Sequence, residues 1–415
     1  MNSRVHVYNE TSQLRTVMVW GEPGCEALLG QLLPKSKSLF FSYYEVPEAR
    51  REFRKMQGMI EAAGVQVIRV KDAYASLLKG KILPGLPSSL AELKKRLHQK
   101  ADEFFETYRE QSTKDLKDDQ VNMTPETVYL QVKRDIDAIL EEDVQAYGEE
   151  AAIKLNYVLS LSRDLPIANI VYGRDQSNAL GDRIVVSIMR WGIRLPEVEI
   201  YREALQHLGY ESVLASVETG TIEGGDSIIF GDTCYIGVGA RTSMEAVLDV
   251  CEKIGDRLQD RGISLVAVVN QKHAADSPSR TVPTQEHMQV MHLDTFWIPL
   301  DEKTVMGYGH EIDQREVIKV SRAKGHIHQE NLGNFRDYLA AQGLELIEVN
   351  QQEQKDFATN LLNLGNKRLL VSLSKNQRVI AELEKRGFEV LKADILKLVG
   401  GYGAVHCLTA PIVRE

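Results

Sequence analysis

A glycine-rich stretch near the end of the chain presents one cysteine. Between residue 400 and Pro411 it contains three glycines, and Cys407 lies among apolar residues. Glycine lets a backbone bend tightly and approach a ligand closely. An isolated cysteine is more often a packed hydrophobe than a reactive thiol, and the alternative is a nucleophile carried on a loop. Which interpretation holds depends on the polar residues that the rest of the chain brings to this loop.

Carboxylates and one histidine are concentrated in three other short stretches. Asp175 ends a run from residue 169 that we expect to be an apolar strand, and Glu223 and Asp226 flank two glycines. His292 and Asp294 stand at the start of a further expected strand. Residues two apart on a strand face the same side. The side chains of His292 and Asp294 are therefore predicted to project together.

The same alternation sets His406 apart from Cys407. Adjacent strand residues face opposite ways, so His406 is a poor candidate for the base that serves the thiol. A metal site at residues 292–294 or at the two histidines of residues 326–328 is a weaker alternative. A thiol in such a site is usually a ligand, and the spacing typical of metal ligands is missing around Cys407. We therefore expect no metal.

Several acids, one histidine and one thiol without metal-ligand spacing suit a cation that sulfur attacks. A guanidinium is planar, stays protonated and carries five N–H donors, and carboxylates can bind it in bidentate fashion. Any one of these acids taken alone is more often a surface or salt-bridged residue. Together they predict a site in which acids hold a guanidinium group beside Cys407.

The elements that must position these residues form a repeated unit. A charged amphipathic helix ends in glycine, which is favoured there because it adopts the left-handed conformation, and a short apolar strand follows at once. Five copies predict five supersecondary repeats around a common axis. The alternative is an ordinary doubly wound α/β sheet, which is disfavoured because a phosphate-binding glycine-rich loop is missing. The helix-ending glycines are Gly64, Gly209, Gly262, Gly343 and Gly387.

A long segment inside the first repeat has a different character. Strand patterns are absent from residues 87–165, where charged helical sequence takes over. Pro125 after Thr124 is typical of the first turn of a helix. We interpret the segment as an inserted helical subdomain. The predicted division of the chain is a first repeat over residues 1–86, the helical insertion over residues 87–165 and the remaining repeats over residues 166–415.

Composition and charge exclude several classes of function. The chain has 415 residues, 43% of them hydrophobic, and a net charge of -9 without a long basic patch, so nucleic acid is a poor candidate partner. No apolar run reaches the roughly 18 residues of a membrane span. Four dispersed cysteines and a polar N-terminus indicate a reduced, cytoplasmic protein. A homo-oligomer is compatible with the sequence.

These motifs resemble those of arginine deiminases and of the wider guanidino-group-modifying superfamily, which includes amidinotransferases, agmatine deiminases and peptidylarginine deiminases. The resemblance runs from the opening residues 5–8 to the Cys407 loop and is strongest in the four stretches above. It implies an α/β fold, a five-bladed α/β propeller of ββαβ repeats with a helical insertion in the first blade. The five repeats counted from the sequence agree with that expectation.

The resemblance implies roles for the residues of the four stretches. Cys407 would be the nucleophile and His292 the general acid and base. Asp175 and Asp294 would hold the guanidinium between them. Glu223 would be a third carboxylate beside the histidine. All five are therefore expected to be catalytic.

Further residues are implied to bind the amino-acid end of the substrate. Asp226 matches the residue that holds the α-ammonium group, and Asn169, Arg194 and Arg241 match contacts to the α-carboxylate. The chain departs from the family where an arginine aimed at the carboxylate usually precedes the cysteine, because that place is taken by Tyr402. A second departure follows Asp175, where the chain runs into residues 176–178. Both departures concern the part of the substrate beyond its guanidinium.

The implied activity is hydrolysis of L-arginine, or of a close guanidino amino acid, to L-citrulline and ammonia. The reaction would pass through a covalent intermediate on Cys407, without a cofactor or a metal. Three alternatives stay open: an amidinotransferase that passes the amidino group to an amine, a deiminase of another guanidino compound, and a non-catalytic arginine-binding protein.

Overall fold

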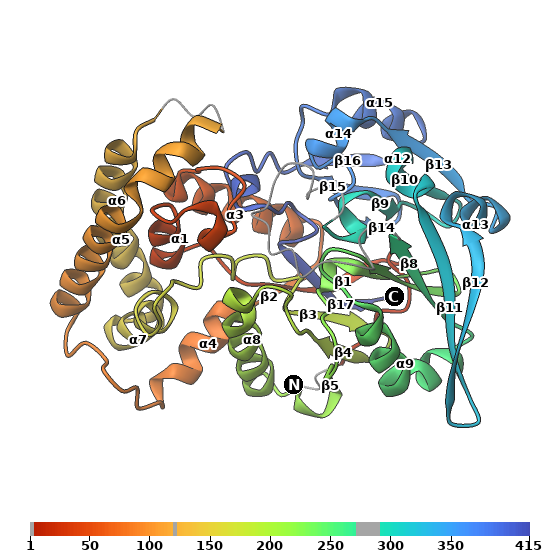
Figure 1. Ribbon diagram of the computed structural model, residues 1–415, viewed down its shortest axis with the longest axis horizontal. Helices are drawn as coiled ribbons and strands as arrows, with labels where there is room; N and C mark the ends of the chain where they lie inside the picture. The colour runs from red at the N-terminus through yellow and green to blue at the C-terminus, as the bar shows by residue number, and fades with distance from the viewer. Residues whose placement is uncertain (1–3, 119–122, 271–290) are drawn as a thin grey trace.

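Five sheets with one shared strand arrangement make up the β structure (Figure 1). The computed structural model describes residues 4–118, 123–270 and 291–415, and the five sheets are those of these residues. In every sheet a central strand pairs antiparallel with one neighbour and parallel with another. The molecule is therefore an α/β protein with mixed sheets.

The strands of each sheet fall into three classes. The central strands are β1 (Leu14–Val19), β4 (Arg183–Val186), β7 (Thr233–Val238), β10 (Thr304–Tyr308) and β15 (Arg368–Val371). Their antiparallel neighbours are β17 (Thr409–Arg414), β3 (Ser177–Leu180), β6 (Ser227–Phe230), β9 (Trp297–Pro299) and β14 (Leu362–Gly365). Their parallel neighbours are β2 (Gln66–Arg69), β5 (Leu214–Ser216), β8 (Ser264–Asn270), β13 (Glu345–Val349) and β16 (Glu389–Lys392).

A helix precedes the parallel strand of each sheet and ends near one of the predicted glycines. These helices are α3 (Val46–Ala62), α8 (Leu195–His207), α9 (Met244–Gln259), α13 (Phe335–Ala341) and α15 (Gln377–Lys385). The five glycines that follow them have φ values between 72° and 88°, in the left-handed region that favours glycine. The prediction of five helix–glycine–strand units is confirmed.

The first sheet differs from the others because it joins the two ends of the chain. Its antiparallel strand β17 comes from the C-terminus and pairs with β1 so that Val19 lies opposite Thr409. Residue Thr409 follows Cys407 by two positions. The turn that carries the cysteine is therefore anchored directly on the N-terminal strand.

Helices fill one side of the molecule and pack on one another. They are α1 (Cys25–Gly30), α4 (Val70–Lys79), α5 (Leu90–Asp118), α6 (Pro125–Tyr147) and α7 (Glu149–Ser160), at the left in Figure 1. The start of α6 is as predicted, with Pro125 in the first turn and the Thr124 hydroxyl accepting a hydrogen bond from the Thr127 N–H. Leu97 and Ile136 share one apolar core with Trp20.

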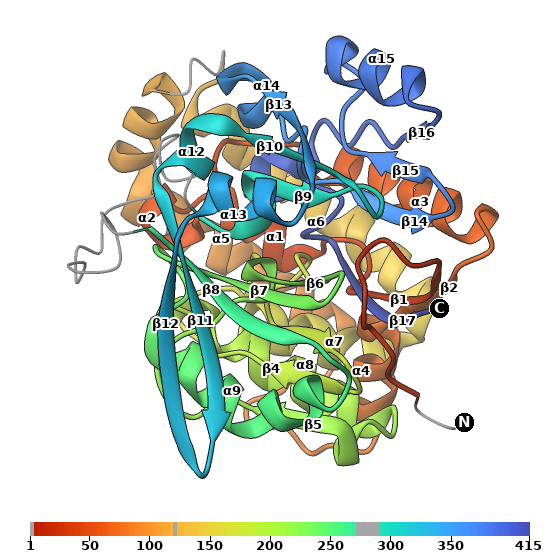
Figure 2. The ribbon, with the colours of Figure 1, turned by 90° about the vertical axis from the view of Figure 1, so that its right-hand side faces the viewer.

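A long hairpin extends the third sheet to five strands. Its strands are β11 (Arg315–Ala323) and β12 (His326–Asn334), and the hairpin projects past the rest of the molecule in Figure 2. His326 and His328 lie exposed on β12, and neither belongs to a group of metal-ligating side chains in the described parts of the chain. The remaining short helices are α2 (Lys35–Ser38), α12 (Gly309–Asp313) and α14 (Gln351–Lys355). None of the helices among the described residues has the length and apolar character of a membrane span.

The strands predicted around the candidate site residues are wrong. Residues 168–171 and 173–176 form turns, Leu293–Thr295 is a turn of 3-10 helix, and residues 405–408 form a turn. The Tyr172 N–H donates to the Asn169 carbonyl at 3.1 Å, and the Thr409 N–H donates to the His406 carbonyl at 3.2 Å. These runs are apolar because they are buried, not because they pair in a sheet.

Candidate active site

The candidate residues stand at equivalent places in the sheets. Each lies in the turn that leads into the antiparallel strand: Asp175 before β3, Glu223 before β6, His292 and Asp294 before β9, and Cys407 before β17. Because the sheets repeat one arrangement, residues at this place in different sheets can meet. All five side chains are buried.

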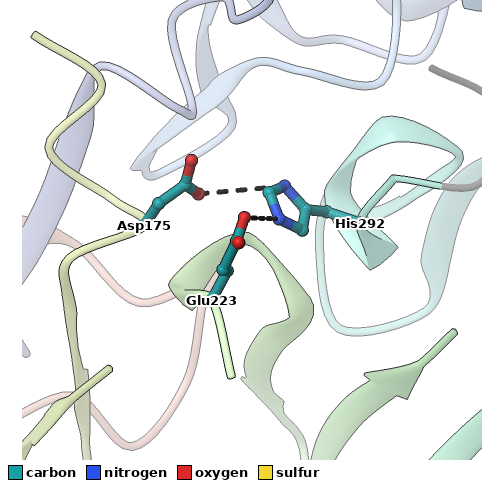
Figure 3. Close-up of side chains that lie close together, drawn as sticks. All are labelled: Asp175, Glu223 and His292. Carbon is teal, nitrogen blue, oxygen red and sulfur yellow. Dashed lines mark hydrogen bonds and ion pairs between the residues drawn. The ribbon is translucent and has the colours of Figure 1, made fainter. Parts of the chain in front are cut away.

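His292 lies between two carboxylates (Figure 3). Its Nε2 is 2.9 Å from Glu223 Oε2, and its Nδ1 is 3.8 Å from Asp175 Oδ1. Burial alone would lower the pKa of His292, but Asp175 and Glu223 raise that pKa to about 9. The imidazole is therefore a cation at neutral pH, with both ring nitrogens protonated.

Two arginines neutralise the carboxylates around His292. Arg241 Nη1 is 3.1 Å from Glu223 Oε2, and Arg194 Nη1 is 2.9 Å from Asp175 Oδ2. Burial would raise the pKa of Glu223, but Arg241 and His292 hold it well below its usual range. Glu223 is thus ionised at neutral pH.

The thiol of Cys407 lies beside Asp294. Cys407 Sγ is 3.9 Å from Asp294 Oδ2, and the same oxygen is 2.6 Å from His406 Nδ1. Burial, and then the negative charges of Asp294 and Asp175, raise the pKa of the Cys407 thiol well above its ordinary value. In the absence of a bound cation the sulfur is a protonated thiol.

The alternation rule predicts that the side chains of His406 and Cys407 face opposite sides of a strand. The rule does not apply here because residues 405–408 form a turn instead of a strand. The imidazole binds Asp294 through its Nδ1. His406 therefore orients the carboxylate and is still a poor candidate for the base.

Sequence reasoning missed Asn360, which holds the cysteine loop. Its Nδ2 donates to Cys407 Sγ at 3.2 Å. Its Oδ1 accepts from the N–H groups of His406 at 3.1 Å and of Cys407 at 3.3 Å. A signal was available, because Asn360 lies just before β14 (Leu362–Gly365), the place that the other site residues occupy in their sheets.

Three buried polar atoms of the site have no hydrogen-bond partner among the residues that the structure describes: Asp175 Oδ1, Asp294 Oδ1 and His292 Nδ1. A Cβ atom placed on Gly225 would lie 2.7 Å from His292 Nδ1 and 3.2 Å from Asp294 Oδ1. The histidine nitrogen and the Asp294 oxygen therefore both pack closely against Gly225, where a side chain would displace them. Buried carboxylate oxygens are nearly always hydrogen-bonded, so these two oxygens are suited to a ligand that carries N–H donors.

The residues expected at the amino-acid end of the substrate have other partners in the structure. Asp226 accepts from the Leu293 N–H at 2.9 Å and from the Thr242 hydroxyl at 2.6 Å, so both of its oxygens support neighbouring segments. Burial raises the pKa of Asp226 to about 7. Asn169 donates to the Ser38 carbonyl at 2.5 Å. Asp226 and Asn169 therefore both hold neighbouring segments of the site in place.

Tyr402 is buried at the start of the cysteine loop. Its ring centroid is 5.6 Å from that of Phe41, and its backbone has a φ of 87°. Burial raises the pKa of Tyr402, and the charge of Arg241 acts against that rise. A Cβ atom on Gly403 would lie 2.4 Å from the Tyr172 ring. The glycine therefore lets the loop pass close to this aromatic side chain.

Asp175, Glu223 and His292 also satisfy the distances of a metal site. One donor atom from each lies within 4.8 Å of the others. However, Arg194 and Arg241 already bind the two carboxylates, and His292 Nε2 faces Glu223. Two buried guanidinium charges oppose a metal cation at such short range. The charges of the group suit its use as an acid–base centre better than its use as a metal centre.

Among proteins of similar sequence is an arginine deiminase. The arginine deiminase of Mycobacterium avium is 24% identical over 264 residues, which span 60% of this chain and 61% of that enzyme. The match therefore covers less than two thirds of that enzyme. An uncharacterized protein of Bacillus subtilis, YkgA, is 25% identical over 296 residues, which span 71% of this chain and 85% of that protein.

Among solved structures of similar fold are two enzymes. A variant of dimethylarginine dimethylaminohydrolase from Pseudomonas aeruginosa, complexed with citrulline, has a TM-score of 0.52 at 13% identity and covers 96% of this chain and 99% of that one. An amidinotransferase from the saxitoxin biosynthetic pathway of Microseira wollei has a TM-score of 0.53 at 14% identity and covers 99% and 98%. At these identities the likeness shows the fold alone.

One family model spans the site. The model described as arginine deiminase matches residues 37–414. That range includes the helical segment, the catalytic candidates and nearly all of the five sheets. The chain therefore belongs to the arginine deiminase family.

Proposed function

We propose that the protein is a hydrolase that converts L-arginine, or a close guanidino amino acid, to L-citrulline and ammonia through a covalent intermediate on Cys407. Membership of the arginine deiminase family supports an enzyme that modifies guanidino groups. The observation that carries the proposal is that one oxygen each of Asp175 and Asp294 lacks a hydrogen-bond partner in the described part of the chain, while Asp294 lies beside the thiol.

The substrate guanidinium would satisfy these oxygens. Its N–H donors bind Asp175 Oδ1 and Asp294 Oδ1, and each contact is a charge-assisted hydrogen bond. The Cys407 sulfur, 3.9 Å from the other oxygen of Asp294, then lies next to the guanidinium carbon. Holding the two reactants in this way removes much of the entropic cost of their encounter.

Substrate binding would also generate the thiolate. In the empty site, burial and the charges of Asp294 and Asp175 raise the pKa of Cys407. A bound guanidinium neutralises those charges and lowers the pKa of the thiol. The Asn360 amide, which donates to the sulfur, stabilises the negative charge. The thiol proton passes to solvent water, and the nucleophile appears only when its target is in place.

The reaction would then proceed in two stages on Cys407. The thiolate attacks the guanidinium carbon, and His292 gives a proton to one terminal nitrogen, which leaves as ammonia while an amidino-thioether remains. Neutral His292 next takes a proton from water, and the hydroxide attacks the same carbon. The carbon–sulfur bond breaks, the added hydroxyl gives its proton to solvent water as it becomes the carbonyl of citrulline, and both the thiolate and the imidazolium are restored. Glu223, which binds His292 Nε2, holds the ring so that Nδ1 does this work.

The architecture proposed from the sequence goes with this mechanism. We propose that the five sheets surround a common axis as a five-bladed propeller, with its first blade over residues 1–86, a helical insertion over residues 87–165 and the other blades over residues 166–415. The common place of the site residues before their strands supports the ring. Strand β17 (Thr409–Arg414) completes the first sheet, so the chain ends of a propeller would be joined in its first blade.

A deiminase of another guanidino compound, or an amidinotransferase, is a second candidate. Tyr402 stands where an arginine is expected in the family, which favours a substrate with a different distal group. An amidinotransferase would form the same thioether and pass its carbon to an amine. We keep Asn169, Arg241, Asp226 and Tyr402 as proposed contacts for the part of the substrate beyond the guanidinium.

The test is a turnover assay with arginine, with and without glycine or lysine as acceptor. Citrulline and ammonia in equal amounts are expected, independent of the acceptor. Ornithine formed only with an acceptor would show an amidinotransferase instead. The Cys407→Ala variant should bind arginine and release no product, and citrulline release by that variant would overturn the assignment of the nucleophile.

A further inference from the structure

We propose that Arg194 and Glu197 form a buried ion pair that positions Asp175, so that Arg194 serves the guanidinium end of the substrate and not its carboxylate end. This inference rests on the proposed function, and it concerns residues on which the family resemblance either is silent or implies another role. Arg194 and Glu197 are 5% and 1% exposed.

All three nitrogens of the Arg194 side chain are bound to carboxylates of the protein. Nη1 is 2.9 Å from Asp175 Oδ2. Nε is 3.1 Å from both oxygens of Glu197, and Nη2 is 2.9 Å from Glu197 Oε2. Nη1 also lies 3.8 Å from Glu223 Oε2. Two buried carboxylates thus hold three of the five N–H donors of this guanidinium, and a substrate carboxylate that displaced either one would leave it without its counter-ion.

The pair belongs to a closed ring of contacts that begins and ends at the Asp175 turn. Arg194 ends a 3-10 turn (Gly192–Arg194), and Glu197 stands in the first turn of α8 (Leu195–His207), so the two are near neighbours in the chain. Glu197 Oε2 accepts from Gln176 Nε2 at 2.6 Å. Gln176 directly follows Asp175. The ring therefore fixes the turn through two adjacent side chains, the Asp175 carboxylate and the Gln176 amide.

The ring determines which oxygen of Asp175 is available. Arg194 holds Oδ2. Oδ1 lies 3.8 Å from His292 Nδ1 and has no hydrogen-bond partner within residues 4–118, 123–270 and 291–415. If the Asp175 carboxylate could rotate, its two oxygens would exchange places. Asp175 Oδ1 would then face the substrate guanidinium only part of the time. The ring also gives a reason for Gln176 after Asp175, one of the positions where the chain departs from the family sequence.

Calorimetric titration of a Cys407→Ala chain tests the proposal. The probes are L-arginine and agmatine, which carries the same guanidinium and no carboxylate. We expect Glu197→Gln in this background to raise the Kd of both probes by similar factors, about tenfold or more, as for a lost charged hydrogen bond. Binding stoichiometry should not change. Gln176→Leu should raise both Kd values in the same direction by a smaller factor.

Glu199→Gln is the matched control, because Glu199 is on the same helix and forms an exposed pair with Arg163 at 2.9 Å. This variant should leave both Kd values unchanged. A Kd increase confined to arginine would show that Arg194 binds the substrate carboxylate, and would overturn the proposal. Lower stoichiometry at unchanged Kd would show that the pair only maintains the fold, and would overturn it too.

The experiment distinguishes failure of the proposed function from failure of the inference about Arg194 and Glu197. If the Cys407→Ala chain binds neither probe, the proposed function is wrong and the inference falls with it. If the chain binds both probes and the variants behave as the control does, only the inference is wrong. Should Glu197→Gln fail to fold, the Gln176→Leu variant supplies the same comparison, and unchanged Kd values in that variant count against the proposal.

Discussion

Asp175 and Asp294 each have one carboxylate oxygen without a hydrogen-bond partner among the described residues, but different groups hold the two side chains. Asp175 is bound by Arg194 at 2.9 Å and lies 3.8 Å from His292 Nδ1. Asp294 is bound by His406 at 2.6 Å and lies 3.9 Å from Cys407 Sγ. One carboxylate therefore stands beside the candidate acid–base group, and the other stands beside the candidate nucleophile.

The groups behind the two aspartates also differ. Arg194 is a permanent cation backed by Glu197 at 2.9 Å. His406 is a titratable group with Glu10 3.7 Å from its Nε2, and Arg414 and His406 hold the pKa of Glu10 near 2 against burial. The two carboxylates therefore act mainly on different groups. Asp175 raises the pKa of His292, and Asp294 raises the pKa of Cys407 more than Asp175 does.

Removing either charge should have the largest effect on turnover. Asp175→Asn and Asp294→Asn should each lower kcat/KM by about a thousandfold, which corresponds to about 4 kcal/mol for breaking a buried ion pair with the substrate. Steady-state citrulline formation measures the loss. Asp182→Asn is the matched control, because Asp182 pairs with Arg257 at the surface. Near-normal rates in either site variant would contradict a clamp made of two aspartates.

The pH dependence of stability should separate the two aspartates. The pKa of His292 is raised from 6.5 to about 9, which corresponds to about 3 kcal/mol of stability. Because the pKa is raised on folding, this stability is complete below pH 6.5 and is lost as the pH rises through about 9. Urea unfolding between pH 6.5 and 9.5 should show the loss in the wild type and in Asp294→Asn.

Asp175→Asn should reduce that loss, since Asp175 is the foremost of the charges that raise the pKa of His292. The same urea unfolding series should be measured for His292→Gln. In that variant the free energy of unfolding should hardly depend on pH over this range. If the free energy of unfolding had the same pH dependence in Asp175→Asn and Asp294→Asn, the proposal that Asp175 is the aspartate acting on His292 would be wrong.

Asn360 offers a smaller effect on the nucleophile side alone. Asn360→Ala removes the donor to Cys407 Sγ and the acceptor for two N–H groups of the loop, and should lower kcat/KM by about tenfold to a hundredfold. Asn360→Asp keeps the acceptor and adds a negative charge near the sulfur. It should therefore lower the rate of thiol alkylation, and an increased rate would contradict this role of the amide.

The reactivity of the thiol should change least, and in the opposite direction to turnover. Asp294→Asn removes the foremost charge that raises the pKa of Cys407, so alkylation of Cys407 in the empty site should become faster at a given pH. Asp175→Asn should accelerate it less. Mass spectrometry of the Cys407 peptide after iodoacetamide treatment gives both rates. Equal rates in wild type and both variants would show that these charges do not act on the sulfur.

Periodicity predicted the repeated framework but could not predict local turns. The glycines at 64, 209, 262, 343 and 387 identified five helix ends, because a left-handed residue has a clear preference for glycine. The turns around Asp175, Asp294 and Cys407 are as apolar as strands, since they are buried, and alternation alone does not tell the two apart. The strand expected around His406 is wrong for that reason, and the exclusion of His406 as the base stays a prediction.

Contacts between distant segments explain the rest of what the sequence did not predict. Asn360 lies in an unremarkable run, and its role depends on a loop 47 residues away. Arg194 was expected at the amino-acid end of the substrate, but its partners Glu197 and Asp175 are visible only in three dimensions. Residue types predicted a guanidinium site, and only the fold shows which oxygens are left for the ligand.

A crystal structure of the Cys407→Ala variant with L-arginine would test directly whether Asp175 and Asp294 bind the substrate guanidinium. We predict that the guanidinium lies between Asp175 Oδ1 and Asp294 Oδ1, with its carbon facing the place of the absent sulfur and one terminal nitrogen near His292 Nδ1. A guanidinium bound elsewhere, with these two oxygens still lacking donors, would contradict the account.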